Sequence, residues 1–281
     1  MTTNSLSTRY TSTLMEKLLG KNYKWWFLLQ SRFKSRTSSF SNNFLFALGQ
    51  MLTLVITLIT WWLANKKIID FDLQQKWTYF VIGELFFSSI FTFAEMGAYD
   101  YIRGGHTKDL LRPQSFMVLK FFEGYGEASF QNLIKVILLL ILLCTMLISN
   151  QISFFDVKFF LATILLLPIS LIILYLLGYI VACNGFFMTQ INGITLNYGL
   201  LLSFLSGKFF PLGLIFENFY LYLLNPFAFT FYHPMQIYLG KYSPLETLWV
   251  FLGGIFWCFV LYFLAKLVFK MGLKKNESVG L

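Results

Sequence analysis

Residues 159–181 read FFLATILLLPISLIILYLLGYIV, an apolar run that contains no charged side chain. A helix needs roughly 20 mostly apolar residues, at about 1.5 Å each, to cross the ~30 Å hydrocarbon core of a bilayer. This stretch therefore predicts a membrane-spanning helix. The rest of the chain has a similar character, since the 281 residues are 57% hydrophobic and include 34 Phe, 15 Tyr and 7 Trp. Such a composition excludes an ordinary soluble domain and indicates an integral membrane protein.

Six runs of this kind predict an all-α, polytopic membrane protein with six transmembrane helices. They cover about residues 44–64, 78–97, 133–149, 159–181, 187–205 and 248–269. Residues 1–42 then form a cytoplasmic arm, residues 43–271 the membrane domain and residues 272–281 a cytoplasmic tail. Within the arm, residues 22–40 mix Trp, Phe and Leu with Lys and Arg, which is typical of an amphipathic helix in the headgroup layer. A frayed start of the first span is the alternative.

The net charge of +9 is a topology signal rather than a sign of nucleic-acid binding. With both termini in the cytoplasm, fourteen Lys and Arg residues fall on the inner side and six on the outer side. The inner set runs from Arg9 to Arg36 and then comprises Arg103, Lys108, Arg112, Lys120, Lys270, Lys274 and Lys275; the outer set comprises Lys66, Lys67, Lys76, Lys158, Lys208 and Lys241. This asymmetry follows the positive-inside rule. We expect a multi-pass protein of the cell inner (plasma) membrane with no nucleic-acid partner.

The connection between the fifth and sixth spans, residues 206–247, is too aromatic for a free aqueous loop. Pro211, Pro226 and Pro234 divide it into pieces too short to cross the bilayer. Non-helical backbone is tolerated at membrane depth only where protein satisfies its polar groups. We therefore expect an external re-entrant helical hairpin here. Two further spans through the same region are the competing count.

Polar residues inside the spans are candidates for a pathway, because a carboxylate near mid-bilayer costs about 3 kcal/mol on insertion scales. Glu84, Ser88 and Thr92 lie on one helical face of the second span. They line a pathway or couple a movement, or Glu84 simply pairs with a donor on a neighbouring helix.

A second polar face occurs in the fifth span, where Gln190, Gly193 and Asn197 follow helical spacing. Small residues permit close backbone approach, and amides hydrogen-bond between helices. This face favours dimerisation or internal packing over a substrate site.

Catalysis by this chain alone finds little support. Cys144, Cys183 and Cys258 stand singly, and the two histidines, His106 and His233, are far apart, so no metal site is expected. The chain has no G-x-x-x-x-G-K-[ST] phosphate loop and no evident Ser, His and Asp set near one membrane face. We expect neither a catalytic residue nor a cofactor within the chain.

A polar stretch, GGHTKDLLRPQSF at residues 104–116, lies in the cytoplasmic connection of about residues 98–130. Its glycine pair breaks the helix that leaves the membrane, and its Arg-Pro pair ends the short helix expected between them. Leu110 and Leu111 on that helix are exposed unless something covers them. The helix either docks into a groove of another protein or is a connecting loop whose leucines lie on the lipid surface.

Three stretches together resemble the ABC-2 type transporter permeases, the membrane subunits of ABC exporters. IRGGHTKDLLRP, at residues 102–113, is similar to the I-R-x-G-x-x-x-x-L-L-x-P signature between their second and third spans. LSFLSGKFFPLGLIFENFYLYLLNPFAFTFYHPMQIYLGK, at residues 202–241, is similar to their f-L-S-G-x-f-x-P turn and re-entrant segment. The N-terminal aromatic and basic helix matches in position, so the resemblance covers about residues 20–270.

By this resemblance the short helix would be a coupling helix that docks on a separate ABC ATPase subunit, which binds ATP and Mg. The coupling residues would be Ile102, Gly104, Gly105, Lys108, Leu110, Leu111, Arg112 and Pro113. The outer hairpin would form an external gate with Pro211, Glu217, Pro226 and Pro234. The resemblance also implies a second permease subunit, identical or homologous, and contact with membrane lipids.

The function that follows is the permease subunit of an ATP-driven exporter of an amphipathic, lipid-like, drug or peptide cargo. Two alternatives stay open. A secondary transporter or channel would use Glu84 as its proton or cation site. A non-transporting scaffold would recruit a cytoplasmic protein through the same short helix.

Overall fold

The computed structural model of the protein describes residues 23–63, 73–88, 97, 99, 101–102, 104, 106–111, 115–150, 157–214 and 218–277. All regular structure in these ranges is helical, and no β-strand occurs in them. The all-α prediction is confirmed for this part of the chain.

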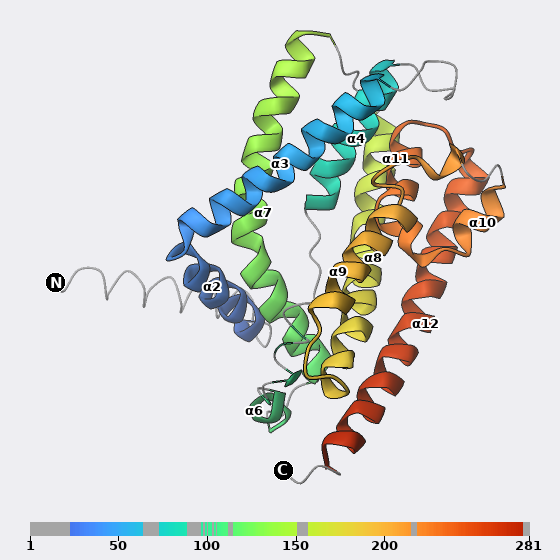
Figure 1. The fold of residues 1–281 in the computed structure, drawn as a ribbon. Helices are drawn as coiled ribbons and strands as arrows, with labels where there is room; N and C mark the ends of the chain where they lie inside the picture. The colour runs from blue at the N-terminus through green and yellow to red at the C-terminus, as the bar shows by residue number, and fades with distance from the viewer. Residues whose placement is uncertain are drawn as a thin grey trace.

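The helices form one elongated bundle (Figure 1). In chain order they are α2 (Tyr23–Thr37), α3 (Phe40–Leu63), α4 (Leu73–Ser88), α6 (His106–Leu110), α7 (Phe116–Ile148), α8 (Val157–Ala182), η3 (Cys183–Phe186), α9 (Asn192–Leu205), η4 (Leu212–Leu214), α10 (Phe219–Leu223), η5 (Pro226–Thr230), α11 (Tyr232–Tyr238) and α12 (Pro244–Glu277). The α6 helix and the C-terminal end of α12 lie at one end of the bundle, and α10 and α11 lie toward the other (Figure 1).

Four helical segments are long and apolar enough to cross a membrane. They are Phe40–Leu63, Phe116–Ile148, Val157–Phe186 and Pro244–Lys275. These segments match the first, third, fourth and sixth predicted spans. The second predicted span begins within α4, and its residues 89–96 lie outside the described ranges.

The fifth predicted span was wrong at its start, because residues 187–191 are not helical. The amides of Phe187 and Met188 both donate to the carbonyl oxygen of Asn184, at 2.9 and 3.1 Å, so the chain turns there. The next helix, α9, has 14 residues and is therefore about 21 Å long at ~1.5 Å per residue. That is shorter than the ~30 Å hydrocarbon core.

The predicted N-terminal amphipathic helix is present as α2, which packs along the first half of α7. A close approach at Gly126 permits this contact, because a Cβ there would lie 2.9 Å from the carbonyl oxygen of Leu29 and 3.0 Å from the Cβ of Arg32. Nearby, the rings of Trp25 and Phe122 stack with centroids 4.9 Å apart. The position of α2 in the headgroup layer stays a prediction.

α7 is longer than the third predicted span, since it begins at Phe116. Residues 116–130 of the predicted cytoplasmic connection are therefore helical. Leu119 and Glu123 are buried on this part of α7, and α2 supplies its packing partner. The non-helical part of the connection ends at Ser115.

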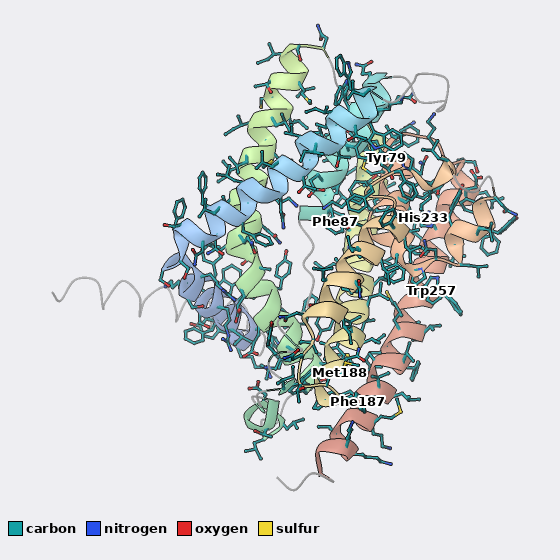
Figure 2. All side chains as sticks on the ribbon, in the orientation of Figure 1. Tyr79, Phe87, Phe187, Met188, His233 and Trp257 are labelled. Atoms are coloured by element: carbon teal, nitrogen blue, oxygen red, sulfur yellow. The ribbon has the colours of Figure 1, made fainter. Side chains whose placement is uncertain are left out.

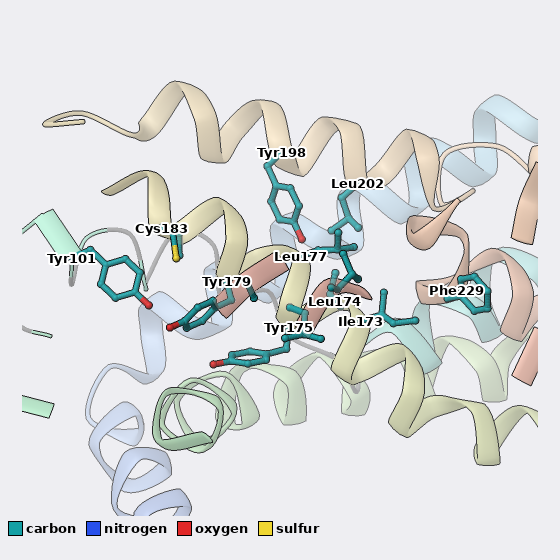
Figure 3. Close-up of a cluster of buried hydrophobic side chains, with 14 of the residues drawn as sticks. Tyr101, Ile173, Leu174, Tyr175, Leu177, Tyr179, Cys183, Tyr198, Leu202 and Phe229 are labelled. Carbon is teal, nitrogen blue, oxygen red and sulfur yellow. The ribbon is translucent and has the colours of Figure 1, made fainter. Parts of the chain in front are cut away.

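The core surrounds α8, which packs against α12 and α11. Figure 3 shows Ile173 and Leu174 of α8 with Tyr198 and Leu202 of α9 directed toward them and Phe229 of η5 beside them. All five side chains are buried. The contacts of α8 with α11 and η5 fix the end of the bundle that carries these short helices to its centre.

Gly126→Val tests the contact between α2 and α7. Overpacking a close contact costs about 1–3 kcal/mol, so the thermal unfolding midpoint in detergent should fall by several degrees. Gly49→Val is the matched control, because no atom lies within 4 Å of a Cβ at that helical glycine. Equal midpoints for the two variants would contradict the predicted packing.

Candidate functional site

The short helix α6 projects at one end of the bundle (Figure 1), and two leucines at its C-terminal end are exposed. Leu111 is 88% exposed and Leu110 is 40% exposed. Gly104 precedes the helix with φ +70°, a left-handed conformation that favours glycine. The Thr107 hydroxyl and amide both bond to the Gly104 carbonyl oxygen, at 2.8 and 3.2 Å. The sequence is thus held as a turn followed by one exposed apolar corner.

Ion pairs tie α6 to α7. Asp109 of α6 is buried, and its Oδ2 lies 2.5 Å from Nζ of Lys120 in α7. Lys120 also contacts Glu123 at 3.1 Å. Asp109 is buried whereas Leu111 is exposed, so ion pairs hold the inner face of α6 and its apolar corner lies on the surface of the described part of the chain.

The same chain of charges continues to α2. Arg32 Nη2 lies 2.6 Å from Glu123 Oε1, and Arg32 Nη1 lies 3.3 Å from Glu127 Oε1. Arg36 contacts Glu127 at 2.6 Å. Burial lowers the pKa of Arg32, but its hydrogen bond to Glu123 and the nearby carboxylates outweigh that effect and leave the pKa raised. Thus α6, α7 and α2 are joined by one continuous ion-pair network.

An aromatic cluster anchors the chain on the inner side of α6. Tyr101 stacks on Phe186 of η3, with centroids 4.5 Å apart, and Phe116 stacks on Phe269 of α12 at 5.0 Å. The chain on both sides of α6 is therefore packed against α12 and against η3, which continues α8.

The other predicted coupling residues are only partly described. Ile102 is half-buried. Lys108 lies within α6, but its side chain lies outside the description, as do Gly105, Arg112 and Pro113 altogether. The apolar corner at Leu110 and Leu111 and the turn at Gly104 are the parts that can be examined.

Glu84 is buried inside the bundle between two lysines. Its Oε1 accepts a hydrogen bond from Nζ of Lys135 in α7. Nζ of Lys208, just after α9, lies 3.1 Å from Oε2 and 3.2 Å from Oε1. Glu84 follows the start of α4 by eleven residues, or about 16 Å of helix. Lys208 was predicted to lie on the outer side of the membrane. Its ammonium group contacts Glu84, which lies eleven residues from the start of α4.

A cavity of about 100 Å³ adjoins this Glu84–Lys135–Lys208 triad. Its polar lining comes from Gln50, Thr53 and Thr57 on one face of α3, together with Glu84 and Lys208. The other two residues of the predicted stripe fall outside the description, since the side chain of Ser88 and all of Thr92 are not described. Among the described residues, the charged partners of Glu84 are lysines from other segments.

The predicted polar face of the fifth span is exposed. Gln190 precedes α9, and Asn197 lies on its outer surface. Gly193 has no atom within 4 Å of a Cβ. This face does not pack against the part of the chain that the structure describes.

Side chains of α3, α4 and the connecting segment itself donate hydrogen bonds to backbone carbonyls at the end of α9 and just after it. The Tyr79 hydroxyl of α4 donates to the Gly207 carbonyl at 2.7 Å (Figure 2). The Trp61 indole of α3 donates to the Phe209 carbonyl at 2.9 Å. Asn225 donates to the Leu205 carbonyl at 2.7 Å. Buried irregular backbone requires such partners.

Side chains of α8 and α12 likewise donate hydrogen bonds to backbone carbonyls of the short helices η5 and α10. Ser170 Oγ donates to the Phe229 carbonyl at 2.6 Å, and the Trp257 indole donates to the Leu223 carbonyl at 2.8 Å. His233 is buried, with Nε2 3.2 Å from the Tyr222 carbonyl oxygen (Figure 2).

The predicted gate residues occupy different places in this segment. Pro211 is buried before η4, and Pro226 begins η5, where the Asn225 side chain caps the helix. Pro234 lies in the first turn of α11 and does not end an element. Glu217 lies outside the described residues.

Sequence reasoning missed the ion-pair network and the lysine partners of Glu84. One signal was present: Arg32 and Arg36 are four residues apart, as are Glu123 and Glu127, so the two helices carry complementary charges at the same spacing. No local pattern connects Glu84 with Lys135 or Lys208. Within the described part of the chain, no three His, Cys, Asp or Glu side chains could hold a metal ion.

The fold is that of a helical membrane protein. The short helix α6 projects at one end of the bundle as a knob. Residues 48–280 match the family of ABC-2 family transporter proteins. The chain therefore belongs to the ABC-2 transporter family, whose members are membrane subunits. Membership of this family implies an ABC ATPase partner. No curated protein and no solved structure matches this chain.

A comparison of Glu84→Gln with Lys208→Gln tests the charge balance of the triad. Removing Glu84 leaves the buried Lys135 ammonium and the half-buried Lys208 ammonium without their counter-ion, which should cost about 3–5 kcal/mol. Removing Lys208 leaves a neutral Glu84–Lys135 pair, and the loss should not exceed the ~1.5–3 kcal/mol of a hydrogen bond to a charged group. Thermal unfolding midpoints in one detergent should rank Glu84→Gln below Lys208→Gln. Equal or reversed midpoints would refute the arrangement.

Proposed function

We propose that this chain is the permease subunit of an ATP-driven exporter and that α6 is the coupling helix on which a separate ABC ATPase subunit docks. The observation that carries the proposal is the exposed corner at Leu110 and Leu111 in a member of the ABC-2 transporter family. ATP and Mg would bind to the partner ATPase, and this chain would supply no catalytic residue.

The anchoring of α6 supports a mechanical role. A knob held only by a loose loop would yield when pushed, whereas α6 is held through Asp109 and Lys120 to α7 and through Glu123 and Arg32 to α2. Movement of a docked ATPase would therefore displace α7 and α2 together. That movement would open a route between the permease subunits toward the outer side.

The direction of the helices supports six spans with both termini in the cytoplasm of a cell whose inner (plasma) membrane holds the protein. In Figure 1, α3, α7 and α9 run toward the end that carries α10 and α11, and α4, α8 and α12 run back. The four long segments would be joined by α4 and α9 as shorter spans. Lys274 and Lys275 in the last turn of α12 then lie on the α6 side, as the positive-inside rule requires.

The bonds around residues 206–243 support a re-entrant outer segment. The α9 helix is shorter than the ~30 Å hydrocarbon core, and Lys208, just after it, reaches the buried Glu84. The carbonyl oxygens of Gly207 and Phe209 accept hydrogen bonds from Tyr79 and Trp61, as backbone at membrane depth requires. Pro211, Pro226, Pro234 and Glu217 would belong to the external gate made by this segment.

The exposed face of α9 supports a second permease subunit, identical or homologous. Gln190, Gly193 and Asn197 have amide and small side chains that suit contact between helices, and they lie on the surface of this chain. Membrane lipids would cover the remaining apolar surface.

The triad does not favour the secondary-transporter alternative. Both oxygens of Glu84 already contact ammonium groups, from Lys135 and Lys208. A transported cation would have to displace a tethered lysine before it could bind. Glu84 is therefore a poor candidate for a cation site.

Leu111→Asp tests docking. An unpaired carboxylate placed in an apolar contact is costly, so we expect at least about a tenfold loss of co-purified ATPase subunit, or ~1.4 kcal/mol, together with loss of ATP-dependent efflux. Ile148→Asp is the matched control, because Ile148 is 84% exposed at the opposite end of α7. Efflux that survives the loss of docking would refute the coupling role, and docking without any transport would favour a scaffold.

A further inference from the structure

We propose that the cavity beside Glu84 and Lys208 binds the oxyanion headgroup, a carboxylate or phosphate, of an amphipathic molecule whose apolar tail lies along α3. The inference rests on the proposed function, because it names the class of cargo that the permease would take. Charge, donors, cavity size and the surface of α3 each support it.

The charge of the triad favours an anion. Lys135 and Lys208 share the single carboxylate of Glu84, and no second carboxylate pairs with either lysine among the described residues. Within the part of the chain that the structure describes, one positive charge of the triad is therefore uncompensated, whereas ionic groups inside a membrane ordinarily occur in pairs. An oxyanion would complete the balance, whereas a cation would add a third positive charge.

Lys208 is the lysine that a ligand can reach. Its side chain is 24% exposed and lines the cavity, whereas that of Lys135 is 5% exposed. An ammonium group has three N–H donors. Lys208 Nζ lies 4.6 Å from the Phe87 ring centroid, and among the described residues Glu84 is the one hydrogen-bond acceptor that it contacts, so it can still donate to a ligand oxygen. Gln50 lines the same cavity, and its amide makes no hydrogen bond within the described part of the chain. These two side chains offer an ammonium and an amide N–H₂ to one oxyanion.

The cavity accepts a headgroup but not a whole cargo molecule. Its volume of about 100 Å³ exceeds the ~10–15 Å³ that a single water needs but is well below the ~300–1,000 Å³ of pockets that enclose drug-sized ligands. Leu54, Phe80 and Phe209 form an apolar wall beside the polar groups. A carboxylate or phosphate fits this mixture, and the rest of the ligand must lie outside.

The surface of α3 provides a place for the tail. Thr53 lines the cavity and is itself exposed, so the cavity opens onto this helix. Beside it, Leu52 is 64% exposed and Ile56 is 63% exposed. A hydrocarbon chain leaving the cavity would contact these side chains. A soluble anion would gain nothing from them.

The test uses the complex as isolated, placed in phosphatidylcholine nanodiscs, with the bound lipid identified by native mass spectrometry. Dioleoyl phosphatidic acid and dioleoylglycerol have the same tails and differ in the phosphate, and inorganic phosphate is the soluble competitor. We expect phosphatidic acid to bind at least about tenfold more tightly than dioleoylglycerol. Excess inorganic phosphate should not displace it.

Lys208→Gln separates binding from folding, because it leaves the neutral Glu84–Lys135 pair in place. We expect this variant to lose the preference for phosphatidic acid, a change of roughly tenfold. Gln50→Leu should lower the preference by a smaller factor. Lys158→Gln, at an exposed lysine in the first turn of α8, is the matched control and should leave the preference unchanged.

Equal binding of the two lipids by the wild-type protein, or an unchanged preference in Lys208→Gln, would overturn the proposal. Displacement by inorganic phosphate would show a site for a soluble anion and would overturn the role of the tail. The same spectra show whether the ATPase subunit is bound. Absence of that subunit from the wild-type complex would contradict the proposed function, while the lipid preference of the permease would still decide this inference.

Discussion

Buried backbone amides and carbonyls must find hydrogen-bond partners, and this requirement governs the segment after α9. The α9 helix is about 21 Å long, so the chain continues as short helices joined by irregular backbone. Trp61, Tyr79, Ser170 and Trp257, from four different long helices, donate to carbonyls of this segment. Residues 206–243 are therefore tied by hydrogen bonds to α3, α4, α8 and α12 at once. A shift of any of these four helices would move the end of the bundle that carries α10 and α11.

The buried charges are organised around α7. Near its start, Lys120 holds Asp109 of α6 and contacts Glu123, which meets Arg32 of α2. Fifteen residues later, or about 22 Å along the helix, Lys135 holds Glu84 of α4. One continuous helix thus connects the exposed knob with the triad and its cavity. A contiguous rigid element is the physical requirement for passing a displacement between two sites, and in the proposed function this helix carries the motor's movement to the cargo site.

Much of the fold follows from length and hydropathy, because an uncharged run such as residues 159–181 can cross a membrane only as a helix. The exposed Leu111 also lies where the local turn chemistry placed it. Other features depend on distant partners. Glycine is common in turns, but Gly126 lies inside α7 and permits its close contact with α2. Lys208 is a charged residue beyond the fifth predicted span, so it was expected outside the membrane. It instead contacts the buried Glu84, which lies 124 positions earlier in the chain. No local pattern contains such pairings.

The central claim is that α6 faces the cytosol, where an ATPase could grip it. Its most direct test is labelling of Leu111→Cys by a membrane-impermeant maleimide, in a chain whose Cys144, Cys183 and Cys258 have been replaced. The account predicts labelling in inverted membrane vesicles and none in intact cells. Labelling of this thiol from the outside of intact cells would contradict it.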